Sequence, residues 1–465
     1  MKKILFAYAP FCTPSSPPYA ITKLYSFMKN NLPSDLFSLG VIDLNVKFFN
    51  INFPEEKILC QSKNPTSEMD VSIEDFKKEF STLSSQENGK LVRGETPLLL
   101  KELLDYLLES KPDVVAFSIV YSSQAFYTLA LIQELKKKGI TTIIGGPAVN
   151  PKLISEADYF LSNEIKLYDY FMKEQNGVEI YNNKDALEKL NYSSLLDYSL
   201  FDHSDYFVSD LVMPIKTSSC CYYQKCTFCT HHANGIYDEF SLNDIEQSIR
   251  LSDVKYVFLI DDMIHKKRLL DIAVMMKNLG VKWMCQLRPT KDLDRETLKI
   301  LFDSGLRQII WGVESGSNRI LSLMKKGTNV EDMSKVLEDS FKVGISNIAY
   351  VMFGFPTETK DEFVETIDFL KSHSDYIDLI SHAVFGLQKE AYIYSHPEEF
   401  DISSINLVER TVLEPRINYV VDSGMSNDEA KKMVWRYRKT LAKLNKYPKV
   451  MNYFREQMFL RVINY

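Results

Sequence analysis

The chain has 465 residues, of which 45% are hydrophobic, 12% aromatic and 25% charged, so a disordered, collagenous or coiled-coil protein is excluded and two or three domains are expected. Its 55 Lys and Arg residues against 62 Asp and Glu residues leave a net charge of −7, which argues against a nucleic-acid or membrane-surface binder. Its 7 cysteines are too few for a disulfide-stapled scaffold, and no apolar run approaches the ~20 residues of a membrane span, so we expect a cytoplasmic protein.

Residues 1–165 alternate between short apolar runs and helical periods, which predicts an α/β domain. Strands are expected at 3–8, 113–119 and 141–144, helices at 19–30, 96–110 and 123–138, and a polar excursion at 50–95. Apolar strands separated by helices indicate a parallel sheet covered on both faces. Ligands of such sheets bind at the carboxyl ends of the strands, where Ser118–Gln124 and Gly145–Pro147 lie.

Residues 166–210 show no clear period and are predicted to be a connector, and the alternation resumes over 211–395. Strands are expected near 212–217, 256–260, 282–287, 308–312, 347–353 and 378–384, with helices between them and a break near Gly327-Thr328. Six strand–helix units are too few for the ordinary eight-stranded barrel, so a partial barrel is predicted. Residues 396–465 are predicted to be a short helical C-terminal region, basic from 431 onward except for Glu456.

Four of the cysteines fall close together, at Cys220, Cys221, Cys226 and Cys229. The last three form Cys-x₄-Cys-x₂-Cys directly after the first barrel strand. Structural zinc would require a fourth ligand, which His231 or His232 could supply. An iron–sulfur cluster bound through three thiolates would leave one iron open to a further ligand. The spacing alone leaves both interpretations open.

Five segments, one per strand–helix unit, resemble the radical S-adenosylmethionine (SAM) superfamily. They are PIKTSSCCYYQKCTFC (214–229), FLIDDM (258–263), QLRPT (286–290), WGVESGSNRILSLMKKGTN (311–329) and YVMFGFPTET (350–359). The superfamily's common spacing is Cys-x₃-Cys-x₂-Cys, one residue shorter than in this chain. We expect Cys221 to be the first ligand, which leaves the role of Cys220 open.

The resemblance implies that Cys221, Cys226 and Cys229 hold a [4Fe–4S] cluster whose open iron is chelated by SAM. One electron from the cluster would cleave SAM into methionine and a 5′-deoxyadenosyl radical, and the protein would supply position and exclude water. The resemblance further implies SAM contacts from Phe228, Asp261, Asp262, Arg288, Glu314, Ser315, Gly354 and Pro356. An electron donor such as flavodoxin or ferredoxin is expected as a partner.

Three segments of the front domain resemble the cobalamin-binding domain of many radical SAM enzymes: SPPYAITKLYSFMK (16–29), PDVVAFSIVYSSQ (112–124) and TTIIGGPAVN (141–150). The implied cobalamin contacts are Ser118, Tyr121, Ser122, Gln124, Gly145, Gly146 and Pro147. The region lacks the Asp-x-His-x-x-Gly signature, so the resemblance implies no histidine ligand to cobalt.

With cobalamin, the resemblance implies a methyltransferase that acts on an unactivated carbon of a peptide or small molecule. One alternative is a radical SAM enzyme without methyl transfer, which would epimerise, cyclise or rearrange its substrate. The other is a zinc-binding module without enzymatic activity. Neither nucleic acid nor a membrane is expected as a partner.

Overall fold

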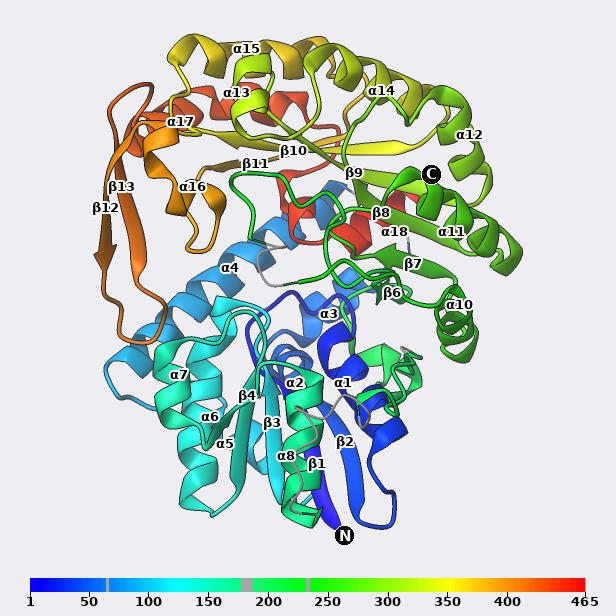
Figure 1. Ribbon diagram of the computed structural model, residues 1–465, viewed down its shortest axis with the longest axis vertical. Helices are drawn as coiled ribbons and strands as arrows, with labels where there is room; N and C mark the ends of the chain where they lie inside the picture. Colours follow the sequence, from blue (N-terminus) through cyan, green and yellow to red (C-terminus); the bar gives the residue numbers. More distant parts are fainter. Residues whose placement is uncertain (64–66, 177–186, 194, 231–234, 465) are drawn as a thin grey trace. The chain divides into compact units, whose positions relative to one another are not determined.

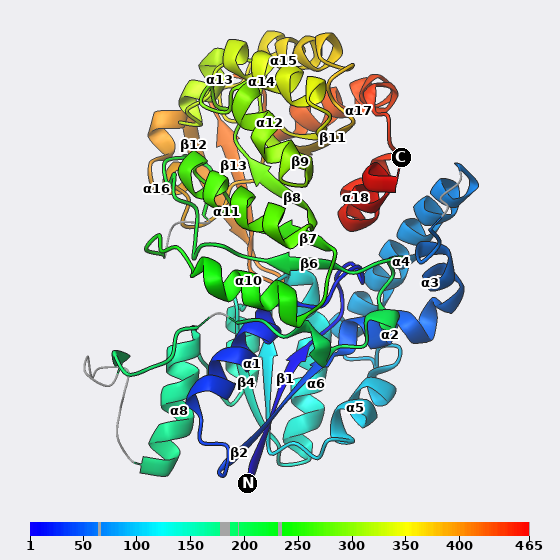
Figure 2. The same cartoon turned by 90° about the vertical axis from the view of Figure 1, so that its right-hand side faces the viewer.

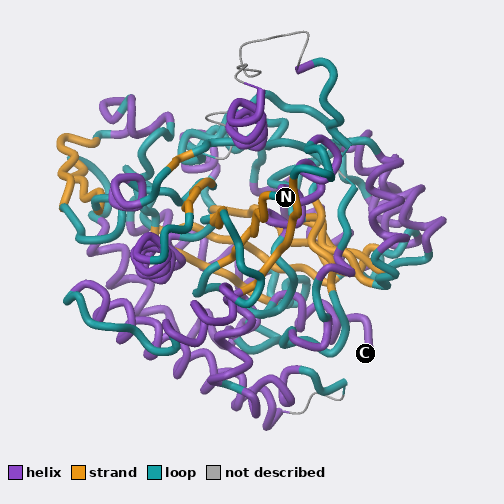
Figure 3. The backbone as a smooth tube through the Cα atoms, turned by 90° about the horizontal axis from the view of Figure 1, so that it is seen from below, coloured by secondary structure: helices purple, strands orange, loops and turns teal. Residues whose placement is uncertain are grey.

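The computed structural model describes residues 1–63, 67–176, 187–193, 195–230 and 235–464 (Figure 1). The chain divides into two compact units. The first unit is Met1–Met213 with Asn243–Asp253 and Glu409–Glu414, and the second unit is Pro214–Leu242, Val254–Val408 and Pro415–Tyr465. Among the described residues, the named strands lie in three sheets, and helices make up most of the remaining regular structure (Figure 3).

The first unit contains a five-stranded sheet in the order β2-β1-β3-β4-β5, and every pair in it is parallel. Its elements are β1 (Lys2–Tyr8), α1 (Tyr19–Asn31), β2 (Phe37–Asp43), α2 (Leu44–Asn52), α3 (Pro54–Cys60), α4 (Ser67–Val92), α5 (Leu100–Leu108), β3 (Val114–Ser118), α6 (Ala125–Lys137), β4 (Thr141–Gly145), α7 (Pro151–Glu156), β5 (Tyr159–Phe160) and α8 (Glu164–Asn176). This is a doubly wound order whose direction reverses between β1 and β3, and such a switch point is where open α/β sheets bind ligands. The predicted Rossmann-like fold is confirmed.

The segment predicted to be a connector, 166–210, begins inside helix α8. Leu167, Tyr168 and Phe171 of this helix are buried in one core with α1 and the sheet. The apolar face of α8 therefore makes it part of the first unit. The predicted excursion at 50–95 is also largely helical, and the ring of Phe53, directly before α3, packs against that of Phe76 in α4 with centroids 5.1 Å apart.

The second unit contains a six-stranded sheet whose strands lie side by side in chain order, β11-β10-β9-β8-β7-β6. Its elements, together with α10, are β6 (Val212–Ile215), α10 (Leu242–Leu251), β7 (Tyr256–Leu259), α11 (Lys266–Leu279), β8 (Lys282–Leu287), α12 (Arg295–Asp303), β9 (Leu306–Glu314), α13 (Asn318–Leu323), α14 (Val330–Lys342), β10 (Ser346–Phe353), α15 (Lys360–Ser372), β11 (Leu379–Val384) and α16 (Tyr392–Ser395). The six predicted strands and the helix break at Gly327-Thr328 are confirmed. The carboxyl ends of all six strands meet along one edge, where the cysteine motif follows β6.

The region from 396 onward is not helical throughout, contrary to prediction. Strands β12 (Ile402–Val408) and β13 (Arg416–Val421) pair as an antiparallel hairpin before helices α17 (Asn427–Leu444) and α18 (Arg455–Asn464) (Figure 2). One face of the hairpin, with Tyr419 5.9 Å from Phe385, packs on the second unit's core. That packing stabilises two short strands that contain β-branched residues. The strands are too exposed to be recognised in the sequence.

Helix α18 lies against the six-stranded sheet. The ring of Phe459 is 6.3 Å from that of Tyr256, and Arg455 Nη1 donates a hydrogen bond of 2.8 Å to the Tyr350 hydroxyl. Arg461, one of the basic residues after 431, is buried. Within the described part of the chain, no helix is both long enough and apolar enough to cross a membrane.

Candidate active site

The cluster loop, defined as residues 220–229, leaves the end of β6 and docks on a turn that follows α13. We call residues 323–327 the docking turn. Thr227 donates its N–H to Met324 O at 3.0 Å and its Oγ1 hydrogen to Leu323 O at 3.0 Å. Tyr223 OH donates to Lys325 O at 2.9 Å. The loop that carries the three thiols therefore has a fixed seat in the second unit.

Asp261, two residues after the end of β7, holds the segment that leads into the cluster loop. Its carboxylate is 1% exposed and accepts the N–H of Thr217 at 2.9 Å and the hydroxyl of Ser218 at 2.8 Å. Burial raises the pKa of Asp261 to about 6, while the Ser218 and Thr217 hydrogen bonds lower it. The structure thus shows Asp261 positioning the loop. Asp262 is half-buried, 3.7 Å from Lys216 Nζ.

Arg288, at the end of β8, joins the cluster loop to the docking turn. Its Nη1 donates to Lys326 O at 2.6 Å, and its Cζ lies 3.5 Å from the centroid of the Tyr223 ring. Its buried Nε finds no hydrogen-bond partner among the described residues. A Cβ at Gly327 would lie 2.3 Å from Tyr223 OH, so a glycine is needed where the turn meets the loop. A free guanidinium N–H at this edge fits an anionic ligand.

Glu314 ends β9 and pairs with Lys326 of the docking turn. Its Oε1 lies 2.8 Å from Lys326 Nζ, and the two side chains are 12% and 5% exposed. Lys326 Nζ is also 5.7 Å from the centroid of the Phe228 ring in the cluster loop. Three predicted SAM contacts, Phe228, Arg288 and Glu314, therefore each lie near Lys326.

The pKa of Cys226, the middle cysteine of the motif, is raised overall. Burial raises the pKa of the Cys226 thiol, while the charges of Lys326 and Arg288 oppose that shift. The pKa of Lys326 is raised, because its attraction to Glu314 and Cys226 outweighs the effect of burial. Three cysteine thiols in one loop are the donor set of a cluster with one open iron, and the cations of the neighbouring docking turn and β8 complement the negative charge of such a centre.

The remaining members of the cysteine group differ in exposure. Cys221, Cys226 and Cys229 are each partly exposed, whereas Cys220 is buried. Gln224 Nε2 donates to Cys220 Sγ at 3.4 Å. Within the described ranges, no three His, Cys, Asp or Glu side chains are gathered as a site for a metal ion. The two candidate fourth ligands for zinc, at positions 231 and 232, lie outside the described residues.

The other predicted SAM contacts lie in two neighbouring loops, after β9 and after β10. Ser315 is fully buried, and its Oγ is 3.2 Å from Thr366 Oγ1 of α15. Gly354 has φ +71°, and a Cβ there would lie 2.4 Å from Ala430 Cβ of α17, so helix packing explains this glycine. Pro356 is buried, and its neighbour Phe355 shares a hydrophobic cluster with Phe228.

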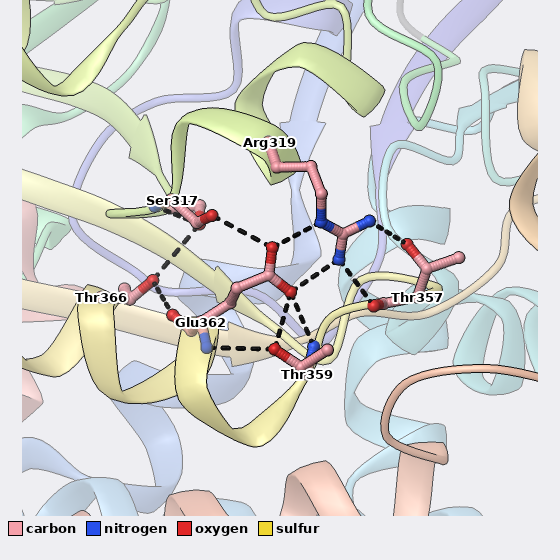
Figure 4. Close-up of polar contacts among 7 residues, drawn as sticks. Ser317, Arg319, Thr357, Thr359, Glu362 and Thr366 are labelled. Carbon is pink, nitrogen blue, oxygen red and sulfur yellow. Dashed lines mark hydrogen bonds and ion pairs between the residues drawn. The ribbon is translucent and has the colours of Figure 1, made fainter.

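A charged network ties these two loops together (Figure 4). Arg319 donates from Nε to Glu362 Oε1 and from Nη2 to Glu362 Oε2, both at 2.6 Å, and from Nη1 to Thr357 Oγ1 at 3.0 Å. Ser317 Oγ donates to Glu362 Oε1 at 3.3 Å, and Thr359 N donates to Glu362 Oε2 at 2.9 Å. The loop after β9, which begins at Glu314, is thereby fixed to the loop after β10.

We expect Glu362 to make folding sensitive to acid. Burial raises its pKa, but hydrogen bonds from Arg319 and Thr359 outweigh burial and lower the pKa from 4.5 to about 2. A depressed folded-state pKa stabilises the fold above pH 4.5 and loses that contribution as the pH falls towards 2. Between pH 5 and pH 3, urea unfolding should show the wild type losing about 2 kcal/mol more than Glu362→Gln.

The control for this prediction is Glu338→Gln, which removes a solvent-exposed pair with Lys342 on α14. Surface pairs contribute little to stability, so this variant should follow the wild type. Equal losses of stability in the wild type and in Glu362→Gln would contradict the prediction.

The predicted cobalamin contacts lie at the carboxyl edge of the first unit's sheet. Tyr121 is 51% exposed, and Ser122 and Pro147 are also exposed, whereas Ser118 is buried. Gln124 is fully buried: its Oε1 accepts the N–H of Val120 at 2.8 Å, and its Nε2 donates to Ala9 O at 2.9 Å. Gln124 therefore shapes the loops around the switch point between β1 and β3.

The two glycines at the end of β4 are required by backbone packing. A Cβ at Gly146, where φ is +112°, would lie 2.4 Å from Ile119 O, and one at Gly145 would lie 2.7 Å from Leu161 O. Side chains at these positions would force the loops apart. The exposed, uncharged groups of Tyr121, Ser122 and Pro147 remain, and they fit contact with a large flat cofactor.

Two residues of the second unit were not recognised in the sequence. Lys326 is the second lysine of MKKG, and nothing in that pattern separates it from exposed Lys325. Glu358 is fully buried, its Oε2 accepts Gly354 N at 2.5 Å, and burial raises its pKa to about 8. Its position two residues after Pro356 was the available signal for Glu358.

Known proteins resemble this chain in sequence and in fold. Residues 215–370 match the model of the radical SAM superfamily. An uncharacterised methyltransferase of Pyrococcus horikoshii is 22% identical over 333 residues, which are 63% of this chain and 71% of that protein.

Two solved structures share the fold over nearly the whole chain. TsrM of Kitasatospora setae, a radical SAM methyltransferase with cobalamin and a [4Fe–4S] cluster bound, covers 94% of this chain and 91% of its own at a TM-score of 0.66 and 14% identity. OxsB, a cobalamin-dependent SAM radical enzyme, covers 100% of this chain and 72% of its own at a TM-score of 0.59 and 15% identity. At such identities the likeness establishes the fold. Residues 215–370 thus form a radical SAM superfamily domain, which follows a Rossmann-like domain in the sequence.

Proposed function

We propose that this protein is a cobalamin-dependent radical SAM methyltransferase that acts on an unactivated carbon of a peptide or small molecule. The observation that carries the proposal is the seating of the cluster loop on the docking turn, where Arg288, Glu314 and Lys326 converge beside that loop. A ligand with both a carboxylate and an ammonium, such as SAM, complements an arginine and a glutamate at one site. Cys221, Cys226 and Cys229 would hold the cluster.

The first unit supports the cobalamin part of the proposal. Its sheet has a switch point between β1 and β3, and the uncharged groups of Tyr121, Ser122 and Pro147 are exposed at the carboxyl edge. When bound, the three cofactors would supply a 5′-deoxyadenosyl radical and a methyl group for transfer. The chain's own residues would bind and orient SAM and substrate, and a donor such as flavodoxin or ferredoxin would supply the electron.

A small-molecule substrate is favoured within this proposal. A structure of TsrM, which shares the fold, contains tryptophan as substrate together with a SAM analogue. Buried Glu358 lies beside Gly354 at the end of β10, where it could donate a hydrogen bond in its neutral form. The cytoplasm, with reduced thiols, is the compartment that we propose for such a cluster enzyme.

The test is anaerobic reconstitution of the full chain with iron, sulfide and cobalamin. Close to four irons and one corrinoid per chain are expected. Incubation with SAM labelled in its methyl group, under reducing conditions, should release S-adenosylhomocysteine and leave label in the corrinoid fraction. Iron without corrinoid, in protein that remains folded, would contradict cobalamin binding.

Radical chemistry without methyl transfer is the second candidate, and the shared fold of OxsB, described as a radical enzyme rather than a methyltransferase, favours it. In that case the same incubation should yield 5′-deoxyadenosine and methionine, with no label on the corrinoid. The two functions therefore differ in the fate of one methyl group.

A further inference from the structure

Lys326 and Glu314 form a buried ion pair, and burying two charges costs desolvation free energy. Lys326 is 4% exposed, and its Nζ lies 2.8 Å from Glu314 Oε1. Removing two charges from water generally costs about as much free energy as their attraction returns. The pair therefore adds little to net stability, and its placement suggests a role in the site.

The ammonium of Lys326 is held in a fixed position. A Cβ at Gly312 would lie 2.7 Å from Lys326 Nζ. The Lys326 side chain therefore occupies space that is open only because residue 312 is a glycine. The backbone oxygen of Lys326 accepts the 2.6 Å hydrogen bond from Arg288 Nη1. Glu314, the partner, ends β9 with φ +64°. Both ends of the pair are thus attached to the sheet edge.

The same ammonium faces the cluster loop. Its Nζ is 5.7 Å from the centroid of Phe228, which stands directly before Cys229. Thr227, directly after Cys226, is fixed to the docking turn by hydrogen bonds to Met324 O and Leu323 O, each at 3.0 Å. The positive charge is therefore fixed next to the segment that carries two of the three thiols.

We propose that Lys326 is a fixed counter-charge that raises the reduction potential of the iron–sulfur cluster, and that Glu314 holds this charge in place and partly offsets it. The inference rests on the proposed function, because it requires the cluster on Cys221, Cys226 and Cys229. Reduction adds one negative charge to the cluster, and a nearby cation stabilises the more negative state more strongly. In this role Lys326 acts on the cluster only through its charge, and it contacts neither the electron donor nor the substrate.

The test compares Lys326→Met with wild-type protein, both reconstituted anaerobically as full chains without SAM. The midpoint potential is measured by a redox titration followed by electron paramagnetic resonance. Lys326→Met should lower the reduction equilibrium constant at least tenfold, which is about 59 mV for one electron. Lys326→Arg should keep most of the wild-type potential. The matched control is Lys325→Met, because Lys325 is exposed and its Nζ stacks over Tyr392.

Glu314→Gln provides an opposite expectation, because loss of the carboxylate leaves the ammonium unopposed and should raise the potential. An unchanged potential in Lys326→Met with full iron content would overturn the proposal, as would equal shifts in Lys326→Met and Lys325→Met. If Lys326→Met does not retain iron, Glu314→Gln decides, and an unchanged or lower potential rejects the proposal. Loss of iron from both variants, with retention in Lys325→Met, would show a purely structural pair. A wild-type chain that takes up no cluster would instead reject the proposed function.

Discussion

Replacing Cys221, Cys226 or Cys229 with alanine is expected to abolish iron binding and reductive cleavage of SAM, whereas Cys220→Ala should keep both. Each of the three thiols is partly exposed on the seated loop, and a cluster with one open iron needs all three. Iron and sulfide per chain, with the visible absorption spectrum, measure the loss. Circular dichroism should remain that of the wild type, because the loop's seat is made by Tyr223 and Thr227.

Cys220 is the matched control for these variants because it is adjacent in sequence but buried, with its Sγ accepting from Gln224 Nε2. Retention of the cluster in Cys221→Ala together with its loss in Cys220→Ala would show that Cys220, and not Cys221, is the first cluster ligand. Metal analysis settles the zinc alternative at the same time. One zinc per chain, without iron or sulfide after reconstitution, would contradict the iron–sulfur assignment.

Asp261→Ala is expected to destabilise the second unit by about 3–5 kcal/mol. The protein that remains folded is expected to bind less of the cluster. The carboxylate accepts hydrogen bonds from Thr217 and Ser218, and removing it leaves buried donors unsatisfied. Those donors lie in the segment that enters the cluster loop. Urea unfolding gives the stability, and iron per folded chain gives the loading.

Two variants separate this expectation from a general loss of charge. Asp261→Asn keeps the shape and one acceptor oxygen, so it should cost about half as much free energy as the alanine variant. Asp262→Asn changes the neighbouring half-buried carboxylate and should cost under about 1 kcal/mol. Equal effects of Asp261→Ala and Asp262→Asn would contradict the positioning role of Asp261.

The six-stranded sheet was predictable because most of its strands contain buried apolar runs separated by helices, as in Val257–Leu259 and Trp283–Cys285. Strand β2 was not predicted. Its residues from Ser38 to Val41 are only half-buried, and its central glycine disfavours a strand. The hairpin β12–β13 was missed for a similar reason, since most of its residues are exposed and its pairing depends on the surface beneath it.

The cluster motif and the strand-end residues could be found from spacing, because each follows a recognisable strand. Their hydrogen-bond partners could not. Asp261 is named by its place after β7, but its bonds to Thr217 and Ser218 connect residues more than 40 positions apart. Lys326 is likewise distinguished from Lys325 by burial alone, which depends on how the turn returns to β9. Such contacts depend on tertiary packing, which local pattern does not encode.

The contacts of helix α18 bear on the order in which the second unit can mature during synthesis. Arg455 and Phe459 contact Tyr350 of β10 and Tyr256 of β7, so these contacts on the sheet form only after the ribosome has produced residues 455–464. At translation rates of about 5–20 residues per second, the cysteines of the cluster loop precede that helix by roughly 10–50 s. The sheet beside the cluster loop can therefore complete its packing only after residues 455–464 have been made, well after the cysteines have left the ribosome.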